Sequence, residues 1–289
     1  MAVAIGLGSY AVARDWTHVW AALASLGVLT VAAALVSVLL ALLATMQVWR
    51  RLLAALGSPL PARAAAQIMF VGQLGKYLPG SLWPVLAQME LGAAHQVPRR
   101  RSATAAVLTM LLSLLTGLFA ALVALPFFAR SHRYWWAFLF APVLVVLLHP
   151  RVLNPVLRRL LRLARRPDLE MPLTGRAILT ASAWALVSWV FYGLQIWLLA
   201  TRLGAPDGKT APLAVGGFAL AWSAGFLVVF VPAGVGVREV VLIAALHPVL
   251  HVADATAVVA LVSRVLLTAG DLLTAAASAG YARRSARPG

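Results

Sequence analysis

Long apolar runs alternate with short polar segments along the chain, and the length of the runs sets the first prediction. A helix needs about 20 apolar residues to cross a bilayer core of about 30 Å. Four runs reach this length: Gly27–Val48, Ser102–Leu125, Ala177–Ala200 and Thr256–Ala277. A shorter run, Tyr134–His149, is a fifth candidate. We therefore predict an all-α integral membrane protein, built as a multi-pass helical bundle.

Two further apolar regions are interrupted by helix-breaking residues. Ala64–Ala93 is broken at Pro79-Gly80, and Leu213–Leu246 is broken at Pro232–Gly236. Since proline ends or kinks a helix, each region is left with arms of about 10–18 residues. Most arms of that length are too short to cross a bilayer. We expect each region to form a re-entrant hairpin that enters and leaves on one side of the membrane.

The basic residues lie between the apolar runs, and their distribution predicts the topology. The sequence contains 24 Lys and Arg residues against 8 Asp and Glu residues. If both broken regions are hairpins, segments 50–64, 95–101, 150–176 and 282–289 share one side and hold sixteen of the 24 basic residues. Because cytoplasmic loops are enriched in Lys and Arg, we place that side and the C-terminus in the cytoplasm, and the protein in the cell membrane of a bacterium. If Ala64–Ala93 instead crossed the membrane once, Arg63 and Arg99–Arg101 would lie on opposite sides, and the excess of basic residues on one side would be smaller.

Composition and motifs exclude most catalytic classes. The chain is 62% apolar and 11% charged, which excludes a water-soluble globule, and it has no cysteine for a disulfide or a thiolate metal site. His247 and His251 have the spacing of a metal pair, but Pro248 interrupts their helix. No Ser/His/Asp set or nucleotide-binding motif occurs, and an intramembrane enzyme acting on lipid phosphate would lack a nucleophile. We expect no enzymatic activity, no cofactor, no metal and no nucleic-acid partner.

Two segments near the N-terminus and one in the middle of the chain are not predicted to be ordinary spans. Residues 1–13 are either a short first crossing or a cleaved signal, since Ala11-Val12-Ala13 has the small-x-small pattern. We expect Trp16–Leu26 to lie at the outer interface. The stretch Arg151–Arg166 is amphipathic and basic, and we expect it to lie on the anionic inner leaflet.

The two halves of the sequence repeat one order of elements. Each has a full span, an apolar region broken at Pro79 or Pro232, an acidic residue at Glu90 or Glu239, and then an Ala/Thr-rich span. Because the predicted topology gives the halves opposite orientations, we expect two inverted repeats. Broken helices at corresponding positions of inverted repeats indicate a transporter whose site lies at the midplane. The alternative is a pair of proline-kinked hairpins that serve packing alone.

The alignment of the halves also predicts the domain boundaries and the site. We expect one polytopic domain, residues 1–289, with repeat one at about 18–125, a linking span at about 134–153 and repeat two at about 177–281. Non-helical backbone at membrane depth is tolerated where it lines protein or a water-filled cavity, so both breaks should form walls of the site. The predicted substrate-binding residues are Lys76, Pro79, Gly80, Ser81, Pro232, Gly234, Gly236, Arg238, Glu239, Arg264 and Asp271.

The charged members of this set carry the prediction of an anion site. A Lys or Arg at the centre of a membrane helix costs about 2.5–3.5 kcal/mol, so Lys76, Arg238 and Arg264 are expected to neutralise a bound anion. Asp271 shares a helical face with Arg264 and is either its partner or a proton-linked group. The alternatives are snorkelling for Lys76, and a purely structural cap and ion pair for Arg238 and Glu239.

Three motifs resemble a known family. Gln73–Gly80, Pro232–Glu239 and Leu261–Arg264 are similar to the transmembrane region of lysylphosphatidylglycerol synthases of the MprF type and of their stand-alone YbhN-like and AglD-like relatives. The resemblance covers the chain from about Trp16 to Tyr281. It implies a lipid flippase, and some relatives accompany glycosyltransferases that use polyprenyl-phosphate lipids.

Two hypotheses follow from the residues and the resemblance together. The first is a transporter that moves an anionic phospholipid or a polyprenyl-phosphate-linked lipid between leaflets. The second is a non-transporting, lipid-binding partner of a membrane glycosyltransferase. No soluble aminoacyl-transferase domain follows Gly289, so we expect no synthesis of lysyl lipid. Leu111 stands in the first repeat where the second has Arg264, so we expect the site to lack two-fold symmetry.

Overall fold

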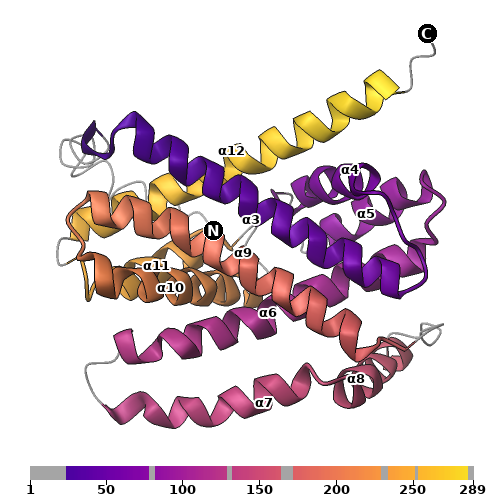
Figure 1. Cartoon of the computed structure of the whole chain (residues 1–289), viewed down its shortest axis with the longest axis horizontal. Coiled ribbons are helices and arrows are strands. Elements are labelled where there is room, and N and C mark those ends of the chain that lie inside the picture. Colours follow the sequence, from indigo (N-terminus) through magenta and orange to yellow (C-terminus); the bar gives the residue numbers. More distant parts are fainter. Residues whose placement is uncertain are drawn as a thin grey trace.

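Helices make up the regular secondary structure throughout the described part of the chain. The computed structural model describes residues 24–77, 82–128, 132–163, 172–228, 234–250 and 253–285, and no strand occurs among them. Five of the described helices are long and apolar enough to cross a membrane: α3 (Val28–Ala55), α6 (Arg99–Phe128), α9 (Gly175–Arg202), α10 (Asp207–Leu227) and α12 (Ala253–Ser285). The prediction of an all-α, multi-pass membrane protein is confirmed (Figure 1).

The four long apolar runs of the sequence correspond to α3, α6, α9 and α12, and local signals set two of their ends. α3 ends where Gly57 takes a φ of 86°, and the N–H of Ser58 donates to the carbonyl of Leu53. α9 ends in the same way, with Gly204 at a φ of 94° and a bond from Ala205 N–H to the Ala200 carbonyl. This left-handed C-terminal turn satisfies orphan carbonyls and favours glycine because it lacks a Cβ.

The first broken region folds back on itself. α4 (Ala62–Gln73) continues into a short 3-10 turn, η1 (Leu74–Tyr77), and α5 (Trp83–Ala93) returns beside α4 (Figure 1). A Cβ on Gly75 would lie 2.8 Å from the backbone nitrogen of Pro84, so the turn depends on glycine there. Pro84 lies in the first turn of α5, where a missing N–H costs little.

The second broken region also folds back, but its first arm is longer than predicted. α10 packs against α11 (Val237–Leu246) across the break. The sequence predicted that α10 begins near Leu213, whereas the helix begins at Asp207 and has 21 residues. Hydropathy misses this first turn and a half because Asp207–Thr210 is polar although it is helical. The arm is therefore long and apolar enough to be a candidate span.

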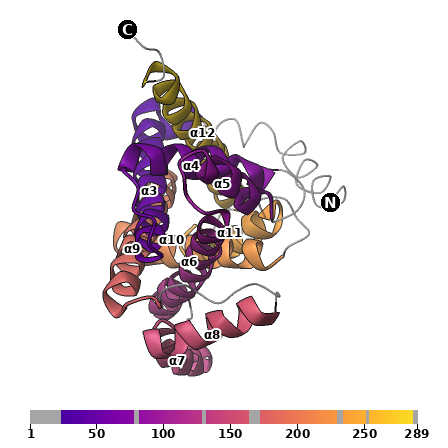
Figure 2. The ribbon, with the colours of Figure 1, turned by 90° about the vertical axis from the view of Figure 1, so that its right-hand side faces the viewer.

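The predicted linking span is bent. η2 (His132–Leu139) and α7 (Phe140–Leu147) lead to α8 (Pro150–Leu163), and Trp136–Leu147 makes an angle of 78° with Pro150–Arg159. Pro150 disfavours a helical residue before it, which explains why no straight helix covers 134–153. α7 and α8 lie together at the end of the molecule opposite α12 (Figure 2). The predictions for residues 1–13 and for Trp16–Leu26 lie outside the described part of the chain, except for residues 24–26, which are helical.

Candidate functional site

A cavity of about 210 Å³ lies among the candidate spans and the two broken regions. Each of the five spans contributes lining residues from near the middle of its length. These lining residues include Leu42 of α3, Ser113 of α6, Tyr192 of α9, Phe218 of α10 and Leu267 of α12. If the spans cross a bilayer, the cavity is therefore at the depth of the hydrocarbon core.

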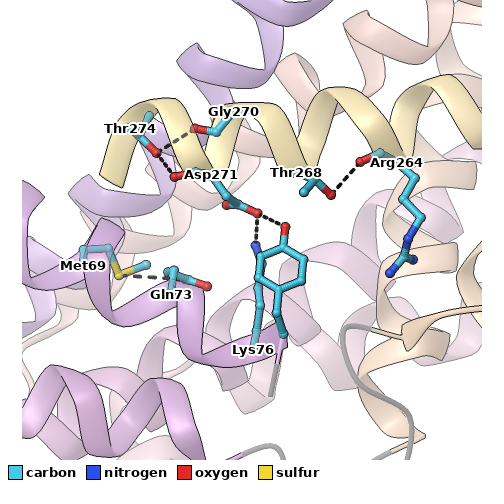
Figure 3. A network of polar contacts seen from close by, with 9 residues as sticks. Met69, Gln73, Lys76, Arg264, Thr268, Gly270, Asp271 and Thr274 are labelled. Carbon is cyan, nitrogen blue, oxygen red and sulfur yellow. Dashed lines mark hydrogen bonds and ion pairs between the residues drawn. The ribbon is translucent and has the colours of Figure 1, made fainter. Parts of the chain in front are cut away.

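One carboxylate on α12 connects this helix to the first broken region. Asp271, whose side chain is 3% exposed, accepts from the Lys76 ammonium at 2.6 Å and from the Tyr77 hydroxyl at 2.6 Å through the same Oδ2 atom (Figure 3). Lys76 and Tyr77 both belong to η1, at the edge of the break. The buried anion is thus compensated by one cation and one further hydrogen bond, as a carboxylate in a low-dielectric site requires.

One cation on α12 connects the helix to the second broken region. The Arg264 guanidinium donates to Oε1 of Glu239 at 2.6 Å. Oε2 of Glu239 accepts the backbone N–H of Gly236 at 2.6 Å, which caps the start of α11. Glu239 therefore has the structural capping role that was the alternative prediction, and its ion-pair partner is Arg264 rather than Arg238.

The third basic residue of the site, Arg238, has unused donor capacity. Its guanidinium lies over the Phe218 ring, 4.4 Å from the ring centroid. Its Nη2 atom is buried and has no hydrogen-bond partner among the described residues. Buried guanidinium donors are rarely left without an acceptor, so this atom is where a ligand oxygen fits best.

These pairings bear on the prediction that three cations neutralise a bound anion. Lys76 and Arg264 line the cavity, but each already has a carboxylate partner. Of the two roles predicted for Asp271, a pair with Arg264 is not formed: seven residues of helix separate them by about 10.5 Å along the axis, so each reaches a different neighbour. The role of Asp271 as a proton-linked group stays a prediction. In Figure 3 the two side chains leave α12 toward different segments.

An aromatic wall, defined as Trp189, Tyr192, Phe218, Trp222 and Phe226, covers one side of the cavity. Tyr192 stacks on Phe218 with ring centroids 5.1 Å apart, and Trp222 stacks on Phe226 at 5.2 Å. The sequence analysis missed this wall because aromatic residues within apolar runs read as ordinary span residues. The spacing of Phe218, Trp222 and Phe226 at four-residue intervals on one helix face was the signal that indicated it.

A close backbone approach positions Arg238. Gly234 has a φ of 66°, and a Cβ there would lie 2.9 Å from the Cα of Gly225 in α10. The contact between these glycines places the start of α11 against α10, where a Cβ added to Gly225 would lie 3.4 Å from the Arg238 Cβ. Only glycine fits this close approach at Gly234 without strain.

The family described as the lysylphosphatidylglycerol synthase TM region matches residues 1–273. The chain belongs to this family. No curated protein and no solved structure matches the chain. The suspected resemblance to lysylphosphatidylglycerol synthases is confirmed, and the family description supports a lipid-related role for the membrane protein.

The predicted site residues of this family member fall into three groups. The residues that line the cavity are Lys76, Gly234, Arg238, Arg264 and Asp271. Gly236 and Glu239 lie just behind the lining, where Glu239 joins the N–H of Gly236 to Arg264. The remaining four lie outside the described residues: Pro79, Gly80, Ser81 and Pro232. Glu90 is exposed, does not line the cavity, and pairs with Arg99 at 2.7 Å.

Proposed function

We propose that the protein is a flippase-like lipid transporter that moves an anionic phospholipid or a polyprenyl-phosphate-linked lipid between the leaflets of the bacterial cell membrane. One observation carries the proposal: the mid-span cavity contains a buried guanidinium atom, Arg238 Nη2, without an acceptor among the described residues. Phosphate is one of the two anions, with carboxylate, whose geometry matches the donor fork of arginine. The family's lipid-related description gives independent support.

The proposal includes two inverted repeats, each with a re-entrant broken region. α3, α4, α5 and α6 would correspond to α9, α10, α11 and α12. The packing pairs support this correspondence because exchanging the halves turns each pair into another observed pair. For example, the contact of α4 with α12 corresponds to the contact of α10 with α6, and the contact of α5 with α6 corresponds to that of α11 with α12. The contact of α3 with α9 corresponds to itself. The matching glycine turns at Gly57 and Gly204 end corresponding helices.

In the proposed mechanism the headgroup passes through the cavity while the lipid chains remain in the bilayer. The repeats rock against each other in alternating access around a fixed site. Asp271 and Arg264 connect α12 to both broken regions, so movement of α12 would reposition both walls of the site together. No covalent chemistry takes part in this mechanism, and the C-terminus lies in the cytoplasm.

A leaflet-exchange assay tests the proposal. The full chain is reconstituted into liposomes that contain a fluorescently labelled phosphatidylglycerol, and the fraction accessible to an impermeant quencher is followed with time. We expect exchange with the wild-type chain, a loss of at least tenfold in rate with Arg238→Gln, and a normal rate with Arg51→Gln, which removes an exposed arginine. Exchange by Arg238→Gln at the wild-type rate would contradict the proposal. Lipid binding without any exchange would favour the alternative role as a lipid-binding partner of a glycosyltransferase.

A further inference from the structure

Three side chains meet at one oxygen atom in the wall of the cavity. Lys76, Tyr77 and Asp271 all line the cavity, and Oδ2 of the aspartate accepts at 2.6 Å from both other side chains (Figure 3). The Asp271 side chain is 3% exposed, whereas that of Lys76 is 31% exposed. The carboxylate is therefore buried, while the cation that compensates it is accessible to an anion that enters the cavity.

An anion in the cavity removes part of this compensation in two ways. Beside Lys76, it competes with Asp271 for the ammonium group. On Arg238, it neutralises a guanidinium that interacts favourably with the Asp271 carboxylate. A buried carboxylate without a compensating cation is costly, and such a group takes up a proton rather than keep its charge. Binding of an anionic headgroup and protonation of Asp271 therefore favour each other.

We propose that Asp271 binds the coupling proton of transport, taking up one proton when an anionic headgroup enters the cavity and releasing it when the headgroup leaves. This inference rests on the proposed function and adds the ion that drives it. The proton comes from solvent and forms an O–H bond on Asp271, which leaves the Lys76 ammonium free to pair with the phosphate. One negative charge and one proton enter together, so the net charge of the site at membrane depth does not change.

Protonation also changes how α12 is held. The charged contact of α12 with η1 becomes a contact between a neutral acid and an ammonium group, whereas the Arg264–Glu239 pair with α11 keeps both charges. The first broken region is then free to move relative to α12 while the second stays attached. A headgroup and a proton that arrive together would thus release one wall of the site, which is the movement that alternating access requires.

One carboxylate occurs among the described residues that line the cavity, and it is Asp271. The charged and titratable groups that face it from the elements packed against α12 are bases or phenols: Lys76 and Tyr77 of η1, Tyr192 of α9 and Arg238 of α11. α12 itself adds Arg264, two turns away. The lining residues of α3 and α4 are neither charged nor titratable: Leu42, Thr45, Met69, Phe70 and Gln73. Asp271 is therefore the acid of the described cavity lining.

The second carboxylate near the site, Glu239, is less suited to carry a proton. Its Oε1 accepts from Arg264 and its Oε2 accepts from the N–H of Gly236, both at 2.6 Å. Protonation would weaken both bonds and remove the negative charge that stabilises the start of α11. Glu239 therefore keeps its charge while Asp271 exchanges its proton.

Proton uptake on lipid binding tests the inference. The purified full chain in weakly buffered detergent solution is mixed with dioleoyl phosphatidylglycerol, a pH indicator measures the protons taken up, and native mass spectrometry measures the lipid bound between about pH 5 and pH 8. The phosphodiester of this probe does not titrate in this range, so the uptake belongs to the protein. Asp271→Asn removes the proposed acid. Glu90→Gln is the matched control, because Glu90 pairs with a basic residue at 2.7 Å but is exposed and does not line the cavity.

Lys76→Met provides a second test in case Asp271→Asn does not fold. Without the ammonium group, Asp271 holds its proton before the lipid arrives, so uptake on binding is lost although the carboxylate is present. If another group took up the proton, Lys76→Met would keep the uptake.

The expected result is proton uptake that depends on the Lys76–Asp271 pair. Wild-type chain and Glu90→Gln should take up about one proton per bound lipid, and their affinity should rise by up to about tenfold for each unit by which the pH falls. In Asp271→Asn and Lys76→Met we expect the uptake per bound lipid to fall at least about fivefold, and the affinity to be independent of pH.

Three results would overturn the inference: no uptake by the wild-type chain, unchanged uptake in Asp271→Asn or Lys76→Met, and a loss of uptake in Glu239→Gln but not in Asp271→Asn. Leaflet exchange without proton uptake refutes the proton site alone, whereas proton uptake without exchange refutes transport alone.

Discussion

Asp271 and Lys76 form a 2.6 Å ion pair that joins the last described helix to the first break in the chain. The carboxylate is almost fully buried, and the Tyr77 hydroxyl donates to the same oxygen. Two turns away on the same helix, Arg264 reaches Glu239 at the start of α11. α12 therefore contacts both broken regions through charges of opposite sign, and the Lys76–Asp271 contact joins the two halves of the sequence.

The Lys76–Asp271 pair should contribute measurably to stability. Asp271→Asn leaves the Lys76 ammonium without its anion, and Lys76→Met leaves a buried carboxylate with one hydrogen bond. Because the Lys76 side chain is 31% exposed, we expect each single change to cost about 1–3 kcal/mol rather than the larger cost of a fully buried pair. The measurement is the melting temperature of the detergent-solubilised protein. The double variant should lose less than the sum of the single losses, and additive losses would show that the pair is not coupled.

Gly234 should be intolerant of any side chain. Gly234→Ala adds a Cβ to a residue at a φ of 66° and places it 2.9 Å from the Gly225 backbone. Gly204→Ala is the matched control, because its φ of 94° carries a similar backbone strain while a Cβ there meets nothing within 4 Å. Backbone strain alone costs about 1–2 kcal/mol. We expect Gly234→Ala to lower the melting temperature more than Gly204→Ala, and equal effects would argue against the close approach.

The ring of Phe218 should support ligand binding through Arg238. Phe218→Leu removes the aromatic face 4.4 Å from the guanidinium and keeps an apolar side chain. A cation–π contact contributes about 0.5–2 kcal/mol, so we expect lipid affinity to fall by about 2- to 30-fold. Phe140→Leu in α7 is the control, because Phe140 is exposed and does not line the cavity. Equal lipid affinity in both variants would exclude this role for the ring.

Hydropathy and charges within apolar runs predicted four of the five candidate spans and two of the cations of the cavity from the sequence. A span must be long and apolar in any membrane protein, so α3, α6, α9 and α12 were visible as runs of residues. Lys76 and Arg264 were identified because a charge in an apolar run is costly and needs a reason. The polar first turn of α10 was missed because helix formation there does not depend on hydrophobicity.

The partners of the charged residues could not be predicted from the sequence. A pair between Asp271 and Arg264 was one of two predictions because the two share one helix face, but both residues pair with side chains that tertiary packing brings from elsewhere. These pairings determine which cation is left without a carboxylate partner. The buried Nη2 atom of Arg238 without an acceptor among the described residues is therefore visible only in three dimensions. The aromatic wall was missed for a similar reason, since its five residues come from two helices that pack together.

The hairpin proposal makes a direct prediction about topology. The chain has no cysteine, so Arg63→Cys and Arg100→Cys each introduce a single labelling site. Both positions are exposed, and they lie on either side of the α4–α5 hairpin. If the hairpin enters and leaves on one side, an impermeant maleimide should reach both cysteines from the same face of the membrane, and from the cytoplasmic face because basic loops stay inside. Labelling of the two positions from opposite faces would mean that α4 and α5 together cross the membrane. The two halves would then no longer be inverted, and the alternating-access mechanism would lose its structural basis.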